Sequence, residues 1–568
     1  MTKSDRSGFV LSFERQGLDG LARHDLGLAR WTETETDEGR AWCFGELLSY
    51  GSDGDTATCL KRLLADWKKG AVAHSSLNGR FILIFRNTQS GELQIVTDRL
   101  GSMHAYMVKS GERSLGVGSD LSTLVRQFST RQLDWEGIAS LFSFGFFLGD
   151  RTHFAYTRIL LPHSVYRISP YGEILERRSY WNWHHMVDEA RSFDETVDAY
   201  DRLLRQAMQR CTAGGRVALP ISGGLDSRSL AAVLPDSAET TAYSYGYSPD
   251  SVELAIAARI AQKRGLSYSS HVIRPYLFER LAEITRALHG CQDVTAARQV
   301  SVNDWVREHA DAVLTGLWGD VWCDQIGLAD GLPAGTTLTA HALHKFQKAG
   351  RAWLLENVVA PHVSQDQASQ LLTDSVTAGL SGYSSITDLD FRMKAYKTSS
   401  WCFRWSNASL RGFEIGAAPR APYFDSDLVD FFCTVPTAFL RGRRLQVEHL
   451  KRYAPDLARI RWQKAEANLY LARYGYWLSL PRRAVSRTVR TVTHRRPLQR
   501  NWEVQFLCQE GREGLQTWLL EPGLKLHDFV AVNKAQKLID RLYAAPNEAD
   551  AYAVSMLLTF SAWLKVGL

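Results

Sequence analysis

At residues 217–232 the chain reads Val217-Ala218-Leu219-Pro220-Ile221-Ser222-Gly223-Gly224-Leu225-Asp226-Ser227-Arg228-Ser229-Leu230-Ala231-Ala232. The apolar run predicts a buried parallel strand, and the residues from Ser229 onward predict the start of a helix. Between them, two adjacent glycines let the backbone approach a ligand closely. The hydroxyls of Ser222 and Ser227 and the N–H groups of the helix start are expected to face one point. The pattern predicts an anion-binding strand-loop-helix site, and the Gly-x-x-x-x-Gly-Lys spacing of a Walker loop is absent.

The hexapeptide Ser222-Gly223-Gly224-Leu225-Asp226-Ser227 resembles the pyrophosphate loop of the ATP-pyrophosphatase group, and specifically that of the asparagine synthetase family. The resemblance implies that the loop holds the phosphates of ATP while a substrate carboxylate attacks the α-phosphorus. It also implies ATP and Mg2+ as cofactors, with Asp226 as a metal ligand.

The bulk composition is that of a soluble globular protein of 568 residues, with 45% hydrophobic and 23% charged residues. The net charge of +6 is small for this length, so a nucleic-acid partner is not expected. No apolar run reaches the roughly 18 residues of a membrane span, and the first six residues lack the apolar core of a signal peptide. The eight cysteines contain no Cys-x-x-Cys pair, which favours reduced thiols. We therefore expect a cytoplasmic protein without a membrane partner.

Residues 1–190 are expected to form the first domain, because short β segments recur through them. The runs 81–85 and 93–97 flank a turn at 87–91 and predict a hairpin. The segments 77–81, 98–101, 141–146 and 159–165 resemble the class II glutamine amidotransferase domain that precedes the synthetase domain in the same family. The resemblance implies an Ntn-like α+β sandwich.

The glutaminase chemistry of that domain is expected to be lost. The family uses an N-terminal cysteine exposed by removal of Met, and this chain has Thr2 at that position. Where the family has Asn-Gly-Glu to bind glutamine, this chain has Phe44-Gly45-Glu46.

Residues 191–568 are expected to form the second domain, an α/β domain with a doubly wound parallel sheet and a helical C-terminal part. Strand and helix patterns alternate after the loop, which is typical of such sheets, and ligands bind at the carboxyl ends of their strands. Ser244 and Gly246 are expected at such an end. The resemblance implies an acidic metal ligand after the second strand, for which Glu253 is the candidate and Asp250 the rival.

The stretch 312–320 predicts a third strand running into a glycine loop that contains Gly316 and Asp320. It resembles the family loop whose acid coordinates magnesium on pyrophosphate, which implies a metal role for Asp320 and a nucleotide contact for Gly316. The family's following glutamate is Val321 here, and Asp324 is the residue that could replace it.

The chain is predicted to be helical from about residue 335. Residues 418–425 resemble a family turn that bounds the acceptor pocket, but the family's glutamate is Ala418 here. In the family that glutamate is tied to carboxylate activation or to deprotonating the amine, and Glu414, one helical turn earlier, is the candidate catalytic residue in its place. Lys464, in the segment 461–464, matches the family lysine that lies against the phosphates. The arginines at 482–500 are either a solvated face or a docking patch for an acidic carrier or peptide leader.

These features predict an ATP-dependent amide-forming ligase that releases AMP and pyrophosphate. Family members that lost the cysteine include β-lactam synthetases and lasso-peptide macrolactam cyclases, which favours ring closure within one small-molecule or peptide carboxylate substrate. A precursor peptide or a protease is then the expected partner. The alternatives are amidation of a sugar acid or another small carboxylate with free ammonia, and a degenerate ATP-binding scaffold.

Overall fold

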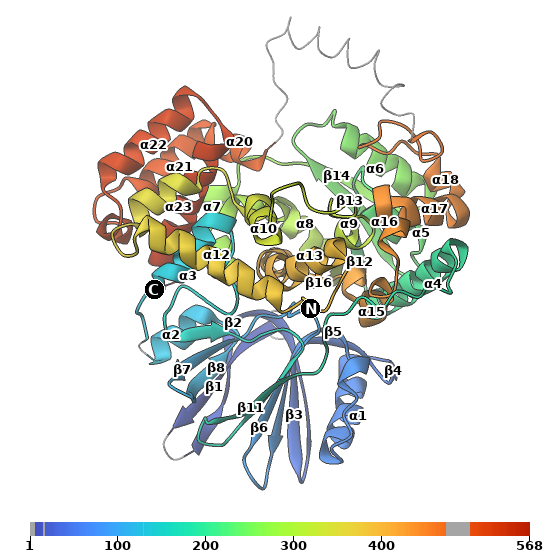
Figure 1. The fold of residues 1–568 in the computed structure, drawn as a ribbon, viewed down its shortest axis with the longest axis horizontal. Coiled ribbons are helices and arrows are strands. Elements are labelled where there is room, and N and C mark those ends of the chain that lie inside the picture. Colours follow the sequence, from blue (N-terminus) through green and yellow to red (C-terminus); the bar gives the residue numbers. More distant parts are fainter. Residues whose placement is uncertain (1–5, 15–16, 129, 473–499, 568) are drawn as a thin grey trace, which may run out of the picture.

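The computed structural model describes residues 6–14, 17–128, 130–472 and 500–567. In Figure 1 an N-terminal half, built on antiparallel strands, lies below a C-terminal half, built on a small parallel sheet surrounded by helices. This arrangement confirms the predicted mixed α/β fold class.

The N-terminal half is a two-layer sandwich. Hydrogen bonds order its strands β11-β10-β6-β5-β3-β2-β1-β8-β7-β9, with β4 on β3. The 20-residue β2 pairs with β1 and then with β3, so it belongs to both layers. Apolar side chains from both layers, including Phe9, Phe44 and Ile84, fill the space between them. The strands are β1 (Arg6–Glu14), β2 (Gly17–Thr36), β3 (Gly39–Tyr50), β4 (Ser52–Asp53), β5 (Asn78–Asn87), β6 (Leu93–Thr97), β7 (Tyr106–Ser110), β8 (Arg113–Gly118), β9 (Thr157–Ile159), β10 (Ser164–Ile168) and β11 (Ile174–Ser179).

Helices cover the outer faces of this sandwich. Helix α1 (Thr56–Lys68) starts after Asp55, whose side chain accepts a hydrogen bond from the backbone N–H of Thr58. Its apolar face buries Leu60, Leu63 and Leu64 against β3 and β5. Helices α2 (Leu121–Phe128) and α3 (Trp135–Phe144) cover the other layer. The predicted hairpin is confirmed, because β5 and β6 pair antiparallel.

The C-terminal half contains the predicted parallel sheet. Its strands are β12 (Val217–Pro220), β13 (Thr240–Gly246), β14 (Ser267–Val272), β15 (Ala312–Leu314) and β16 (Ala418–Arg420), in the order β14-β13-β12-β15-β16. All four pairings are parallel. Leu219 and Leu314 enter one apolar cluster, and Ala218 and Val313 enter another on the opposite face. Both faces are therefore buried, as expected for a doubly wound sheet.

Strand β16 corrects the prediction that everything after residue 335 is helical. Residues 418–420 pair with β15 and extend the sheet at its edge. Three residues give no recognisable alternation, so only the tertiary pairing reveals the strand.

The remaining elements are helical. Those around the sheet are α4 (Phe193–Thr212), α5 (Asp226–Ala232), α6 (Val252–Lys263), α8 (Asn303–His309), α9 (Gly319–Trp322), α14 (Asn407–Glu414), α15 (Ser426–Phe432), α16 (Thr437–Leu440), α17 (Arg444–Tyr453) and α18 (Pro455–Ala458). Further helices are α7 (Leu277–Leu288), which packs against α23, and α10 (Leu338–Phe346), α11 (Arg351–Leu354), α12 (Gln365–Ser381), α13 (Leu389–Lys397), the π-helix η6 (Thr398–Ser406), α20 (Asn501–Phe506), α21 (Gln509–Leu519), α22 (Val532–Ala544) and α23 (Glu548–Val566). Within the described ranges, no helix combines the length and apolar character needed to cross a membrane.

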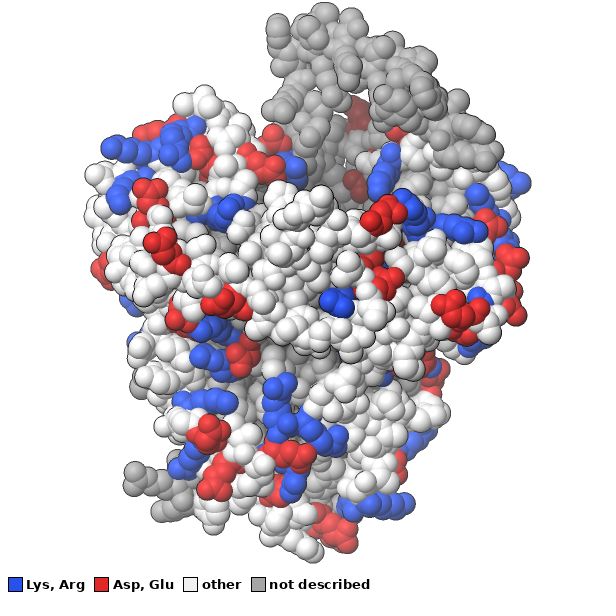
Figure 2. All heavy atoms as spheres, viewed as in Figure 1, with Lys and Arg blue, Asp and Glu red and all other residues white. Residues whose placement is uncertain are grey.

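Two further features concern the charged surface and the cysteines. Figure 2 shows basic and acidic side chains interspersed over this face, in keeping with the net charge of +6. All eight cysteines are free thiols, and every one except the half-buried Cys508 is buried.

Candidate active site

The sheet order places a switch point where the sequence predicts the phosphate loop. Strands β13 and β14 lie on one side of β12, and β15 and β16 lie on the other. The order of the strands along the chain therefore reverses between β12 and β15, and such a switch point is where open α/β sheets bind ligands. The loop 221–225 leaves β12, and residues 315–318 leave β15.

The two serines of the loop converge as predicted. The backbone N–H of Ser222 donates to Oγ of Ser227 at 2.9 Å, and the two hydroxyls lie 3.1 Å apart. The N–H of Gly224 donates to Oγ of Ser222 at 3.2 Å. Helix α5 begins at Asp226, earlier than the predicted start at Ser229. Hydrogen bonds to the hydroxyl groups of Ser222 and Ser227 thus hold the loop in its conformation.

Asp226 and Asp320 are close enough for their charges to interact. A side chain at Gly319 would place its Cβ 2.9 Å from Oδ1 of Asp226, and one at Gly316 would come within 3.2 Å of the Asp226 Cβ. The pKa of Asp226 is raised, first by burial and then by the negative charge of Asp320, against the lowering effect of Arg443. Glycines at both positions therefore let the two loops meet and bring two carboxylates together.

Arg443 and Gln446 bind one oxygen of the Asp226 carboxylate. Nη1 of Arg443 donates to Oδ1 at 2.6 Å, and Nε2 of Gln446 donates to the same atom at 3.3 Å. Asp324 accepts from the N–H of Gly442 at 2.9 Å and lies 3.8 Å from Nε of Arg443. Asp324 thus supports the arginine. Sequence reasoning missed Arg443, because its role depends on the left-handed turn at 442–443.

The carboxylate pair fits a magnesium ion that is also bound by phosphate oxygens. In the described part of the chain, Oδ2 of Asp226 has no hydrogen-bond partner, and the Asp320 side chain is exposed. No group of three His, Cys, Asp or Glu among these residues is arranged to hold a metal by itself. Mg2+ is usually held by one or two carboxylates together with substrate phosphates, so Asp226 and Asp320 suffice only in the presence of a phosphate ligand.

A pocket beside the loop contains the other predicted nucleotide contacts. It is lined by Pro220, Ile221, Ser222, Ser244, Tyr245, Gly246, Tyr247, Ser251, Glu253, Ile273 and Arg298. Glu253 shares this pocket with Arg298 and belongs to no metal-binding group with Asp226 and Asp320 among the described residues. Burial raises the pKa of Glu253, and Arg298 partly offsets that effect. Its rival Asp250 is exposed and does not line the pocket.

The two predicted catalytic residues lie in different surroundings. The N–H of Gln463 donates to the carbonyl of Gly223 at 3.2 Å, which brings the next residue, the exposed Lys464, to the phosphate loop. Glu414 is buried at the end of α14 and forms an ion pair with Arg80 of strand β5. In the structure, the backbone at Lys464 therefore lies beside the phosphate loop, whereas Glu414 is paired with the N-terminal half.

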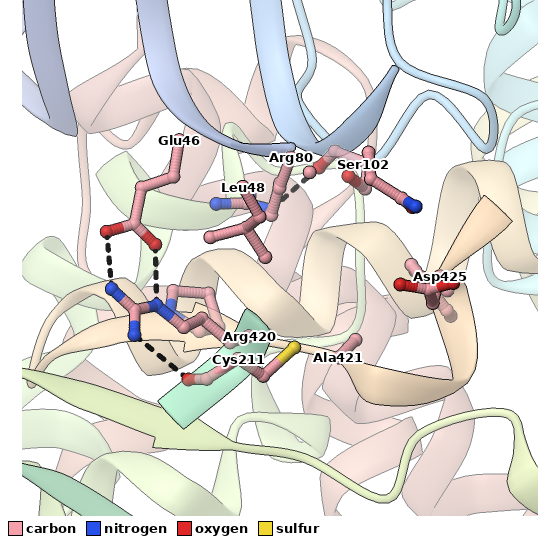
Figure 3. A pocket seen from close by; sticks show the side chains of 12 residues that line it. Glu46, Leu48, Arg80, Ser102, Cys211, Arg420, Ala421 and Asp425 are labelled. Carbon is pink, nitrogen blue, oxygen red and sulfur yellow. Dashed lines mark hydrogen bonds and ion pairs between the residues drawn. The ribbon is translucent and has the colours of Figure 1, made fainter. Parts of the chain in front are cut away.

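A second pocket lies between the two halves (Figure 3). Its lining residues are Glu46, Leu48, Asn78, Gly79, Arg80, Ser102, Cys211, Pro419, Arg420, Ala421, Phe424 and Asp425. Both oxygens of Glu46 accept hydrogen bonds from Arg420, at 2.9 and 3.0 Å, and Arg30 lies 2.8 Å from Oε1. Burial alone would raise the pKa of Glu46, but these cations lower it. The acid that the resemblance assigned to glutamine binding is thus engaged by arginines, whereas Thr2 and the arginines at 482–496 lie outside the described residues.

Two separate parts of the chain match models of known protein families. Residues 45–181 match a glutamine amidotransferase domain, and residues 199–324 match asparagine synthase. The second match contains the phosphate loop, Glu253 and Asp320. Together the two matches support an asparagine synthetase-type protein. No curated protein matches the chain.

Two solved structures show distant likeness. Glutamine phosphoribosylpyrophosphate (PRPP) amidotransferase from B. subtilis, complexed with ADP and GMP, is 12% identical over 49% of this chain and 62% of its own, with a TM-score of 0.20. A structure of the allosteric regulatory enzyme of purine biosynthesis is also 12% identical, over 48% of this chain and 60% of its own, with a TM-score of 0.20. The match thus spans about three fifths of those chains, and a TM-score this low carries no functional information.

Proposed function

We propose that this chain is an ATP-dependent amide-forming ligase: it adenylates a substrate carboxylate, releases pyrophosphate and passes the acyl group to an amine. The observation that carries the proposal is the meeting of three segments at one sheet edge: the Ser222–Ser227 loop, the Asp226–Asp320 pair and the segment ending in Lys464. The asparagine synthase match over residues 199–324 supports ATP-dependent amide-bond formation in general.

Each segment has a defined task in this proposal. Ser222, Ser227 and the loop N–H groups bind the phosphates of ATP, and the pocket with Ser244, Gly246 and Glu253 receives the rest of the nucleotide. Asp226 and Asp320 would hold Mg2+, which neutralises phosphate charge when bound. Lys464 stabilises the negative charge that develops as pyrophosphate leaves, where a positioned cation has its largest effect.

The amine is supplied with the substrate in this proposal, not by glutamine. The family's nucleophilic cysteine is Thr2 here, and Glu46 is bound by Arg420 and Arg30. Ring closure within one molecule, as in a lasso-peptide macrolactam cyclase, therefore needs no ammonia source. Glu414 remains the candidate base for the amine, and its ion pair with Arg80 would have to open for that role.

Pyrophosphate exchange tests the proposal directly. The protein is incubated with Mg-ATP, labelled pyrophosphate and a panel of peptide carboxylates and uronic acids, with and without ammonium. We expect exchange with at least one carboxylate and its loss in Asp320→Asn and Lys464→Met. Lys451→Met, which removes a lysine of α17 that lies 4.0 Å from Glu448, serves as the control and should retain exchange.

The same assay separates the alternatives. Exchange only with uronic acids, and product only with ammonium, would replace ring closure by sugar-acid amidation. ATP binding in calorimetry without exchange would favour the scaffold, and release of glutamate from glutamine would contradict the proposed loss of glutaminase activity.

A further inference from the structure

Arg228 is a fully buried cation that directly follows the phosphate loop. Its side chain is 0% exposed. Nη1 donates to the carbonyl oxygens of Leu457 at 3.3 Å and Ile460 at 2.9 Å, and Nη2 donates to that of Arg461 at 2.7 Å. The guanidinium therefore holds the backbone turn 457–461 from the side of α5.

No carboxylate balances this charge in the described part of the chain. Every hydrogen-bond acceptor of Arg228 there is a backbone carbonyl. Burial alone lowers its pKa, to about 10, and its Nε is buried without a hydrogen-bond partner. A buried charge without an opposite charge is costly. A neutral donor could satisfy these carbonyls without the cost of a buried charge, so the charge of this arginine requires another explanation.

Its position connects the two segments that build the phosphate site. Arg228 follows Ser227, whose hydroxyl closes the loop on Ser222. The turn that it holds leads directly to Gln463, whose N–H binds the Gly223 carbonyl, and then to Lys464. Arg228 and Arg461 are 233 residues apart in sequence, so this contact fixes two distant segments against each other.

We propose that Arg228 is a positioning residue of the phosphate site: it holds the 457–461 turn so that Lys464 stays at the loop, and bound phosphate supplies the negative charge that its buried guanidinium lacks in the free protein. This inference rests on the proposed function, because it requires the loop to bind phosphate groups. Direct contact is not needed, since charges interact over several ångströms in a poorly screened interior.

Thermal unfolding of the full chain with inorganic pyrophosphate or Mg-ATP tests the inference. Arg228→Met removes the charge, and Arg228→Lys keeps the charge without the planar fork that reaches several carbonyls. Arg404→Met is the matched control, because Arg404 is 3% exposed and donates to the carbonyls of Gly149 at 2.7 Å and Arg151 at 2.8 Å.

We expect both ligands to raise the Tm of the wild type, because a ligand that binds the native state stabilises it. The rise should shrink in Arg228→Met, with pyrophosphate binding weakened about tenfold or more. Arg404→Met should lower the Tm of the free protein and keep the full ligand-induced rise. Arg228→Lys should recover much of the rise, yet show a larger loss in kcat than in KM for ATP during exchange, because Lys464 is misplaced.

The outcomes separate this inference from the proposed function. If neither ligand stabilises the wild type, the proposed function fails and the inference fails with it. If the wild type is stabilised and Arg228→Met responds equally, the inference alone is overturned. If Arg228→Met does not fold, Arg228→Lys decides, and an unchanged kcat together with a full Tm rise would overturn the positioning role.

Discussion

At the scale of single residues, the site depends on how closely two loops approach. Gly319 lies where a Cβ would contact both Oδ1 of Asp226, at 2.9 Å, and the ring of Tyr423, at 2.7 Å. Because Tyr423 is fully buried, it cannot move aside easily. A Cβ at this position would therefore displace both the carboxylate of Asp226 and the backbone of the Gly319 loop.

Gly319→Ala is therefore expected to reduce pyrophosphate exchange about tenfold or more, because catalytic groups tolerate little displacement. It should also lower the free energy of unfolding by about 1–3 kcal/mol, because the added methyl group overpacks the contact with Tyr423. Exchange kinetics and thermal unfolding measure the two effects. Gly382→Ala, whose Cβ would meet nothing closer than 3.5 Å, is the control. Equal exchange rates in both variants would contradict the proposed tight fit at Asp226.

At the scale of elements, the N-terminal sandwich contributes to stability at a distance from the phosphate loop. Leu63 of α1 is 0% exposed and packs against the outer face of β3 and β5. Leu63→Ala should lower the free energy of unfolding by about 2–5 kcal/mol, the range for buried leucines. The exchange rate per folded molecule at 25 °C should stay unchanged, as measured with active-site titration. A proportional loss of kcat would show that this sandwich acts on the chemistry.

Elements with a strong local signal could be predicted from sequence. The strands before Ser222 and Gly316 are apolar runs that end in glycine loops, so their position and the role of the loops follow from local pattern. The site around them could not be predicted in full. Arg228 and Arg443 act through carbonyls and carboxylates far along the chain, and Glu414 pairs with Arg80 across the two halves. Such contacts depend on tertiary packing and produce no periodic pattern in the sequence.

At the scale of the whole molecule, buried ion pairs join the two halves. Glu46 on β3 and Arg420 on β16 form a two-hydrogen-bond pair, and the Arg420 side chain is only 5% exposed. Arg420 also donates to the carbonyls of Cys211 and Ala213 at 2.9 and 2.8 Å. The Glu46–Arg420 pair in the pocket between the halves therefore joins β3 of the N-terminal half to β16 of the parallel sheet.

Removing one partner of this pair should be costly. Glu46→Gln is expected to lower the free energy of unfolding by about 3 kcal/mol, because it leaves the buried Arg420 without its carboxylate partner. Arg420→Met should cost less, because Arg30 still lies 2.8 Å from Glu46. The double variant should lose less than the sum. Denaturant unfolding of all four proteins measures the coupling, and strict additivity would contradict it.

The Glu46–Arg420 pair also predicts that the free energy of unfolding depends on pH. The pKa of Glu46 is lowered in the folded protein from its ordinary value of 4.5, so its contribution is fully present above pH 4.5 and is lost as pH falls through the folded pKa. The difference in stability between wild type and Glu46→Gln should therefore be constant near neutrality and shrink on acidification. A difference that grows towards acid would contradict this assignment.

Alkylation of the buried cysteines can report when the folded structure around each of them opens. Cys43 and Cys59 lie in the N-terminal half, and Cys211, Cys323 and Cys433 lie around the parallel sheet. Burial raises the pKa of Cys211, Cys323 and Cys433 to about 12, so an alkylating reagent, which attacks the thiolate, reaches these groups only when the surrounding structure opens. Mass spectrometry of the alkylated peptides would time each opening separately. If the ion pairs between the two halves make them unfold as one unit, the thiols of both halves will be modified at one common rate.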